Sequence, residues 1–484
     1  MKLEISKDLS KNLTAIKEEI GGPKTFDLVN RDFEIGDKEV SLVFIDSFAK
    51  GDLLNKILEF LMKTKREEIS IDVLKKLLNN RLPILEVTVV DKIDDLIDEV
   101  LSGPQALLID GIDQAIIIDA RTWMSRTPEE PELEKATRGP EDGFIETMLF
   151  NLQMIRRRIR DPKLRAEVIK VGQRSQTDTC VVYIDDIANL SLVEDIKDRL
   201  NKIEVDGLPL ADRTIEDYLV GDKFNLLPKV RYTNRADIAS SHLLEGKICV
   251  IVDNSPTVLL LPATMFDHTQ TLEDYRQPPI PGTYINLLRL CSILISLFLP
   301  ALWLLFAYNP NWLPEILQII GPKEIGKIPL GIQFVLASIG IDLIRIASIQ
   351  TPSSLATSLG LIGALMLGEF SVKVGLFAPE VILYMAIAAI SSFTIPGFEF
   401  SLTLKLFRLF LIIAVILFKG LGLIVGSVIV FLIFALSKSF GTPYLWPLLP
   451  FNWQALKTYF IRQSTLSLDK RRSNVHQLED QTRK

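Results

Sequence analysis

The stretch VFIDSFAKGDLLNKILEFL at Val43–Leu61 decides the fold of the front half of this chain, because it returns at one constant offset as VYIDDIANLSLVEDIKDRL at Val182–Leu200. Each copy begins with a short apolar run that predicts a buried strand. Each continues with apolar residues at helical spacing. Two strand-then-helix units with matching apolar positions indicate an internal duplication.

The duplication continues downstream. The stretches ALLIDGIDQAIIIDA at 106–120 and CVIVDNSPTVLLLPA at 249–263 each consist of two apolar runs around a turn sequence, which is typical of a hairpin. We therefore predict two similar cytoplasmic α/β subdomains, at 25–121 and 139–268. A helical segment at 1–24 precedes them, a polar linker at 122–138 separates them, and a proline-bearing, extended connector at 269–284 follows.

Four aspartates, Asp46, Asp110, Asp185 and Asp253, fall at strand ends or turns. Sheets of α/β proteins often bind ligands at such positions. The simpler interpretation, which we favour, is that these side chains cap helices and close turns.

The back half of the chain is apolar enough for a membrane. Runs such as INLLRLCSILISLFLPALWLLFAY at 285–308 exceed the ~18 residues that mark a spanning helix. Together they predict an α-helical polytopic membrane domain at 285–440 with four to six helices. Apolar segments lie near 285–308, 328–349, 353–372, 379–397, 402–419 and 421–437.

The tail at 441–484 is basic, and the N-terminus has no apolar signal sequence. Both features predict that the tail and the front domain face the cytoplasm, which requires an even number of spans.

Charged and polar residues inside the apolar segments are the main functional candidates. Asp342 and Arg345 are three residues apart, and Glu369 and Lys373 are four apart, so each pair shares a helix face. Charges at membrane depth mark an ion or solute path unless they form structural pairs or lie at the interface. Segment 352–373, with Ser354 and Ser358, is our candidate pore lining.

Composition excludes several other classes of function. A net charge of −6 gives no case for nucleic acid, and the three cysteines lack the spacing of a zinc site. We find no nucleophile with a base, no phosphate loop and no dinucleotide motif, and so predict no enzyme, no cofactor and no metal.

The stretch RGPEDGFIETMLFNLQMIRRRIRD at 138–161 has acids at its front and arginines at its back. We predict a helix that starts at Pro140 and places opposite charges at the ends that its dipole favours. One face, including Leu152 and Ile155, must be buried. Arg156 projects at the edge of that face, which predicts an acidic partner at a domain or subunit contact.

Several long motifs in this order resemble the A subunit of bacterial spore germinant receptors, over about residues 5–462. The motifs are the stretch at 138–161, VYIDDIAN at 182–189, LLEGKICVIVDNSPTVLLLPA at 243–263 and FAPEVILYMAIAAI at 377–390. Two further stretches, RYTNRADIASSHLLEG at 231–246 and FDHTQTLEDYRQPPIPGTY at 266–284, look most like a paralogue of those receptor subunits.

The resemblance implies a protein of the inner spore membrane that lets ions leave the spore core during germination. It implies a homo-oligomer, possibly a pentamer, that forms a cation channel with other germination membrane proteins as partners. Receptor subunits usually carry Thr-Glu-Arg-Pro-Asp where this chain has Thr-Asn-Arg-Ala-Asp at 233–237. The glutamate and the proline of that motif are replaced here, whereas Arg235 and Asp237 match it. We predict that these two residues lie at an oligomer or domain interface, as we do for Arg156.

Two alternatives to a channel remain open from the sequence. A signalling or assembly subunit without a pore would not need Asp342 or Glu369. A secondary transporter would show inverted repeats in its membrane half, whereas the only repeat that we find lies in the soluble half.

Overall fold

The computed structural model describes residues 3–49, 51–69, 73–80, 86–121, 138–312, 321–322, 326–350, 360, 363 and 365–462. The chain divides into two compact units. One contains residues up to Lys223 together with Tyr232–Pro262, and the other contains Phe224–Arg231 and the helices from Ala263 onward. Residues 122–137 of the predicted linker, Ser354, Ser358 and the tail from 463 lie outside the described residues.

The first unit holds two five-stranded antiparallel sheets with the same topology, ordered β1-β2-β4-β5-β3 and β6-β7-β9-β10-β8. The strands of the first sheet are β1 (Leu28–Ile35), β2 (Lys38–Ile45), β3 (Val87–Val90), β4 (Gln105–Ile109) and β5 (Ala115–Ile118). Those of the second are β6 (Leu164–Val171), β7 (Thr177–Ile184), β8 (Arg231–Thr233), β9 (Ile248–Val252) and β10 (Val258–Leu261). The predicted duplication is confirmed, and so are both hairpins, β4–β5 and β9–β10.

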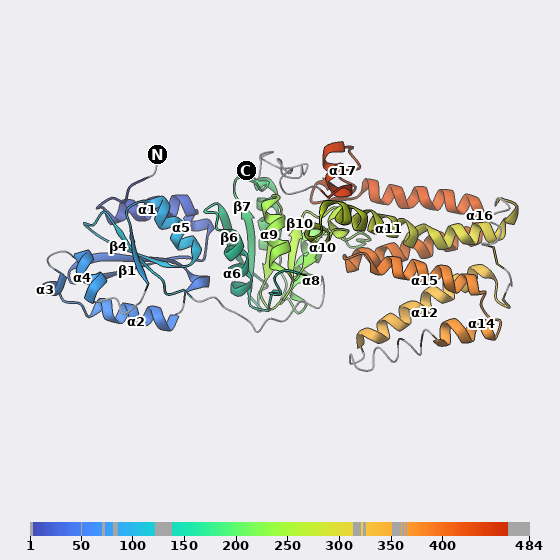
Figure 1. Ribbon diagram of the computed structural model, residues 1–484, viewed down its shortest axis with the longest axis horizontal. Helices are drawn as coiled ribbons and strands as arrows, with labels where there is room; N and C mark the ends of the chain where they lie inside the picture. Colours follow the sequence, from blue (N-terminus) through green and yellow to red (C-terminus); the bar gives the residue numbers. More distant parts are fainter. Residues whose placement is uncertain are drawn as a thin grey trace. The chain divides into compact units, whose positions relative to one another are not determined.

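Helices cover both faces of the first sheet (Figure 1). Helices α1 (Leu9–Ile20) and α5 (Ile93–Ser102) bury one apolar cluster with the sheet, and α2 (Gly51–Met62) and α4 (Val73–Asn80) bury the other. The short α3 (Arg66–Ile69) precedes α4. Because Ile16 and Ile20 of α1 lie in the same core as Val43 and Ile45, the N-terminal helix belongs to the first subdomain.

The second sheet has matching helices. These are α6 (Met148–Arg158), α7 (Leu190–Asn201), α8 (Ala211–Val220) and α9 (Ala236–Leu244). Helix α6 packs against α9 and strand β9, and α7 packs against α8.

In each subdomain, an asparagine of the first helix bonds through its side chain to the backbone just before that helix. Asn12 accepts from the Ser6 backbone N–H and donates to the Ser6 carbonyl, at 2.8 and 2.6 Å. Asn151 makes the same two bonds with Ile145 at the same distances. The duplication therefore reaches α1 and α6, further than the sequence alignment indicated.

Two of the four aspartates cap these helices. Asp110 accepts from the Leu9 N–H at 3.3 Å, and Asp253 accepts from the Met148 N–H at 3.0 Å. For these two residues the capping interpretation is confirmed.

The predicted helix start at Pro140 is wrong, because α6 begins only at Met148. The Phe144 N–H donates to the Asn234 carbonyl, and Asn151 holds the backbone of Ile145, so this part of the chain runs extended. Asp142 still pairs with Arg158, at 2.7 Å, but through a fold-back of the chain rather than along a helix. The buried face is confirmed, since Leu152 and Ile155 are fully buried.

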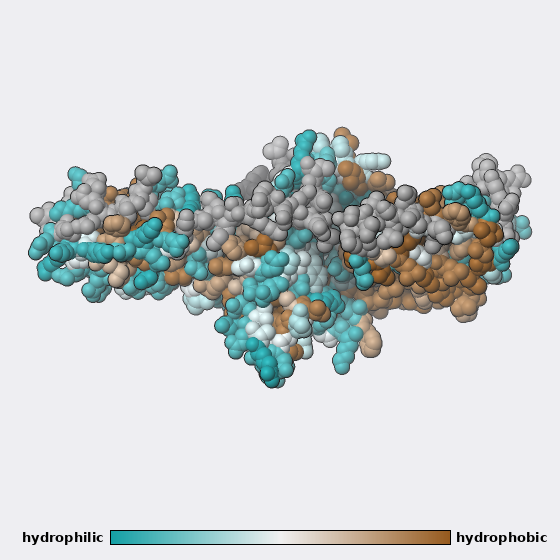
Figure 2. Space-filling view, turned by 90° about the horizontal axis from the view of Figure 1, so that it is seen from below, coloured by the Kyte–Doolittle hydropathy of each residue, from teal (hydrophilic) through white to brown (hydrophobic). Residues whose placement is uncertain are grey.

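The second unit is helical. Its helices are α10 (Leu272–Arg276), α11 (Pro279–Tyr308), α12 (Leu330–Gln350), α14 (Ser371–Lys373), α15 (Pro379–Phe393), α16 (Phe398–Leu436) and α17 (Trp453–Phe460). Two short strands, β11 (Lys438–Ser439) and β12 (Thr442–Pro443), form a hairpin after α16. Three of the described helices, α11, α12 and α16, are long and apolar enough to cross a membrane. Figure 2 shows hydrophobic residues over these helices and hydrophilic residues over much of the α/β subdomains.

The connector differs from the extended chain that we predicted at 269–284. It contains α10, and α11 already begins at Pro279. Proline lacks the backbone N–H that a first helical turn leaves unpaired, so it fits this position without loss of a hydrogen bond.

Helix α16 folds back on itself at Lys419, whose φ of 51° and ψ of −129° are not helical. The ring of Phe434, near the end, lies 5.5 Å from that of Phe407 in the first arm. The sequence predicted two segments here, at 402–419 and 421–437, and the two arms of this hairpin confirm them.

The two arms approach so closely that residue 422 must be glycine, since an added Cβ would overlap the Ala414 carbonyl. We expect Gly422→Ala to destabilise the protein by about 1–3 kcal/mol through overpacking, measured as thermal unfolding in detergent. Gly368→Ala is the matched control, because a Cβ there meets no atom within 4 Å. Equal unfolding midpoints for the two variants would contradict the close packing of the arms.

Candidate functional site

Residues 264–274 and the first turns of α11 form a polar junction where the helical unit begins. We call this cluster the entry junction. Arg289 of α11 donates to the Thr394 carbonyl at 3.1 Å and to the Thr269 carbonyl at 3.3 Å, and it pairs with Asp274. Arg289 and Asp274 are both largely buried. One guanidinium therefore joins the connector, α11 and the end of α15.

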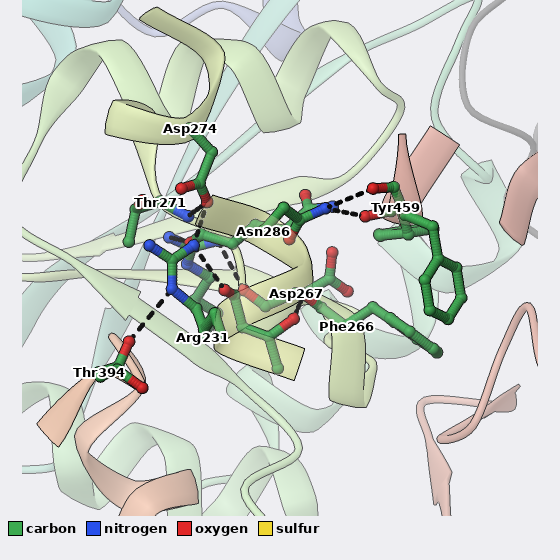
Figure 3. Close-up of polar contacts among 12 residues, drawn as sticks. Arg231, Phe266, Asp267, Thr271, Asp274, Asn286, Thr394 and Tyr459 are labelled. Carbon is green, nitrogen blue, oxygen red and sulfur yellow. Dashed lines mark hydrogen bonds and ion pairs between the residues drawn. The ribbon is translucent and has the colours of Figure 1, made fainter. Parts of the chain in front are cut away.

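Two capping boxes shape the connector itself. Asp267 accepts from the backbone N–H and hydroxyl of Thr264, at 2.7 and 2.8 Å. Asp274 accepts from the Thr271 N–H at 3.2 Å. Reciprocal caps of this kind satisfy the free N–H groups of short helices. Arg231 donates to the Asp267 carbonyl at 2.7 Å, as Figure 3 shows.

Residues 224–231 lie between α8 and β8 in sequence but pack within the helical unit, and we call them the inserted segment. The Pro228 carbonyl is 3.1 Å from His268 Nε2. Ser439 donates to the Lys229 carbonyl at 2.7 Å, and Thr403 of α16 donates to the Leu226 carbonyl at 2.9 Å. Leu227 lies in the apolar core of the helices. This segment is thus bonded to both ends of the α16 hairpin.

The end of the described chain returns to the start of α11. Asn286 donates to the carbonyl of Tyr459, a contact drawn in Figure 3, and the Arg462 N–H donates to the Thr283 hydroxyl at 3.1 Å. The helical unit is therefore entered and left by the chain at one end.

Inside the helices, the predicted partner of Asp342 is wrong. Asp342 pairs with Lys405 of α16, with 2.5 Å between Oδ1 and Nζ, and Arg345 instead stacks on the Phe398 ring at 4.5 Å. Helical spacing placed Asp342 and Arg345 on one face of α12 but could not show that α16 brings a closer cation. Lys405 is almost fully buried, whereas the Asp342 side chain is 43% exposed.

Glu369 and Lys373 do form the predicted ion pair, on an exposed surface. Segment 352–373 is described only in part, so its role as a pore lining stays a prediction.

Arg156 lies at a contact between the two α/β subdomains, as predicted. Its Nε and Nη2 atoms donate to the two oxygens of Asp27, at 2.5 and 2.7 Å, and both side chains are at most 1% exposed. Next to this pair, the Phe26 N–H donates to the Ala166 carbonyl at 3.1 Å. A bidentate arginine–carboxylate pair fixes orientation as well as distance.

The other two interface candidates lie within the second subdomain. Arg235 pairs with Asp237 at 2.9 Å and donates to the Pro140 carbonyl at 3.0 Å, and it is 2% exposed. In the described chain these contacts hold the extended segment before α6 in place.

The chemistry of the described residues gives no metal site. No group of three or more histidine, cysteine or acidic residues in that part of the chain could hold an ion. Burial raises the pKa of the Cys180 and Cys249 thiols, which keeps them protonated inside the second sheet. Protonated thiols are poor metal ligands.

Sequence reasoning missed Arg231, Arg289, Lys405 and Arg408. Lys405 and Arg408 sit three residues apart in an apolar run, which was signal enough for a shared helix face. Arg231 and Arg289 carry no local signal, because their acceptors are mostly backbone carbonyls far away in sequence.

Comparison with known proteins gives the family. The profile described as Bacillus/Clostridium GerA spore germination protein matches residues 14–474, nearly the whole chain. The chain belongs to the GerA family. It is 41% identical to Stage V sporulation protein AF of Bacillus subtilis (strain 168), over 98% of this chain and 96% of that protein.

A second relative is similar along nearly its full length. Spore germination protein GerLA of Bacillus cereus is 30% identical, over 99% of this chain and 98% of that protein. Among solved structures, the N-terminal domain of the A subunit of the Bacillus megaterium spore germinant receptor GerK3 is 27% identical, with a TM-score of 0.43. The match covers 55% of this chain and 98% of that domain. These relatives are named for sporulation or germination, and none of them for an enzymatic reaction.

Proposed function

We propose that this GerA family protein assembles with copies of itself in the inner spore membrane and conducts ions, cations in particular, out of the spore core during germination. The names of its relatives support a role in sporulation and germination. Its apolar helices support a place in a membrane. Other germination membrane proteins would be its partners.

The proposed topology has six spans, with the α/β subdomains and the tail facing the core. The ends of the helices support this count. Gly331 of α12 lies against Tyr308 at the end of α11, whereas Arg345 lies over Phe398 at the start of α16. Leu376 lies against Gly326, at the same end of the helices as Gly331 and Tyr308. Gln350 and Leu376 would therefore lie at opposite ends of the membrane domain, and with α15 and the two arms of α16 the proposed count is six.

The partial exposure of Asp342 is the observation that most supports the proposal of conduction. Of the three long described helices, α12 is the least buried, with 22% of its most apolar stretch buried, against 28% for α16 and 50% for α11. The partly exposed Asp342 lies on this helix. Lys405 pairs with one oxygen of this carboxylate, but the exposed part of the Asp342 side chain would still be costly at membrane depth unless it faces water or another copy. In an oligomer, one Asp342 from each copy would form an acidic ring of the kind that selects cations.

Ion flux tests this proposal. Protein in liposomes should release potassium, and Asp342→Asn should slow release about tenfold, the effect of ~1.4 kcal/mol on a barrier. Glu59→Gln, exposed on α2, is the control and should leave flux unchanged. Absence of flux in every assembly state would remove the proposal.

The entry junction favours one alternative, a signalling or assembly subunit without a pore. Its bonds join the inserted segment, the connector and the helix ends, which suits transmission of a signal. In that case Asp342→Asn and Glu369→Gln would leave ion release and germination rate unchanged, while changes at the junction would alter both.

A further inference from the structure

The cations between α12 and α16 outnumber the acids. Lys405 pairs with Asp342, and both Arg345 and Arg408 lie close enough to Lys405 to act on it electrostatically. The cluster therefore holds three cations and one carboxylate. At membrane depth such an excess is unfavourable unless a counter-charge is present.

Arg408 is the cation with the weakest set of partners. Its side chain is buried, with 2% exposed, and its Nη1 reaches only the carbonyl and hydroxyl of Ser296 on α11, at 3.5 and 3.4 Å. The Asp342 carboxylate acts on Arg408 electrostatically but forms its ion pair with Lys405, and no ion pair joins Arg408 to a carboxylate of the described residues. A guanidinium has five donors, so most of its hydrogen-bonding capacity is not used by these contacts.

The position of Arg408 limits what can neutralise it. It lies ten residues after Phe398, about 15 Å along the first arm of α16, which is near the middle of a spanning helix. Its burial keeps it away from lipid, so a phosphate headgroup cannot reach it. A counter-charge that comes from outside the protein would have to be small and to enter between the helices.

We propose that a small monovalent anion, a halide or a short carboxylate, binds beside Arg408 between α11, α12 and α16. The guanidinium of Arg408 and the ammonium of Lys405 would hold it, because both donate charge-assisted hydrogen bonds to anions. The Ser296 hydroxyl, which accepts from Arg408, would donate its proton to the same ion. This site adjoins the cation path proposed at Asp342, because Lys405 pairs with that carboxylate, but anion binding does not depend on conduction.

Equilibrium binding to the full-length protein in detergent tests this site, with radioactive chloride and acetate as the probes. The wild type should bind one of them saturably, and Arg408→Gln should weaken that binding at least about tenfold, as loss of a charge-assisted bond does. Arg408→Lys keeps the positive charge but loses the paired N–H donors of the guanidinium. It should therefore weaken the binding of acetate more than that of chloride. Lys373→Gln, an exposed cation elsewhere in the helical unit, should bind like the wild type.

Two outcomes would overturn the site: no saturable binding of either probe to the wild type, or equal binding by Arg408→Gln. If Arg408→Gln does not fold, Ser296→Ala takes its place and should weaken binding severalfold. Because binding is measured without flux, a failure here is distinguishable from a failure of the proposed conduction.

Discussion

Arg156→Ala is expected to destabilise the α/β region by about 3–5 kcal/mol, the usual cost of removing one partner from a buried ion pair. The variant leaves the Asp27 carboxylate without its two bonds at a place where water does not reach it. Thermal unfolding of the full-length protein in detergent measures the loss. Subunit assembly, followed by size, shows whether the contact between subdomains also supports the oligomer.

Arg157→Ala is the matched control, since Arg157 is the next residue on the same helix and is exposed. We expect it to change stability by less than about 0.5 kcal/mol. A double replacement, Asp27→Asn with Arg156→Met, should recover much of the loss because no buried charge remains. If Arg156→Ala unfolds and assembles like the control, the ion pair does not hold the subdomains together.

Arg289→Ala is expected to have the second large effect, a loss of about 3 kcal/mol, because it leaves Asp274 buried and unpaired at the entry junction. The Thr269 and Thr394 carbonyls lose a donor at the same time. The connector would then lose the side-chain bonds through which Arg289 joins it to α11 and to the end of α15. We expect both a lower unfolding midpoint and altered ion release from liposomes.

Arg276→Ala is the control for this position, since Arg276 is exposed at the end of α10. This variant removes an exposed charge of the connector and leaves the Arg289–Asp274 pair in place. A midpoint for Arg289→Ala no lower than that of Arg276→Ala would show that the junction is not an important source of stability.

The sequence predicted the strands with strong apolar runs and missed those without them. β2, β4, β7 and β9 lie inside their sheets, so both faces are apolar and the run is visible. Strand β1 has the sequence LVNRDFEI, whose charges reflect its place at the edge, and β8 has only three residues. Sheet edges and short strands are determined by their neighbours, which a single sequence does not show.

The candidate functional residues also show that a single sequence does not reveal neighbours in space. The position of Arg156 on a helix face was enough to predict burial and an acidic partner. The partner itself, Asp27, lies in a loop of the other subdomain and could not be found from spacing. For Asp342, spacing suggested the wrong partner, since Lys405 comes from a helix more than sixty residues later. Helical periodicity predicts faces, and tertiary packing selects the pairs.

The inserted segment has a consequence for the order in which this protein can fold during synthesis. Residues 224–231 leave the ribosome before any membrane helix exists, because α11 begins only at Pro279. Two of their hydrogen-bond donors, Thr403 and Ser439, are made much later, at the two ends of the α16 hairpin. Domains generally fold as units from the N-terminus onward. The segment therefore lacks these partners, and Leu227 lacks its apolar core, until the last apolar hairpin has been inserted.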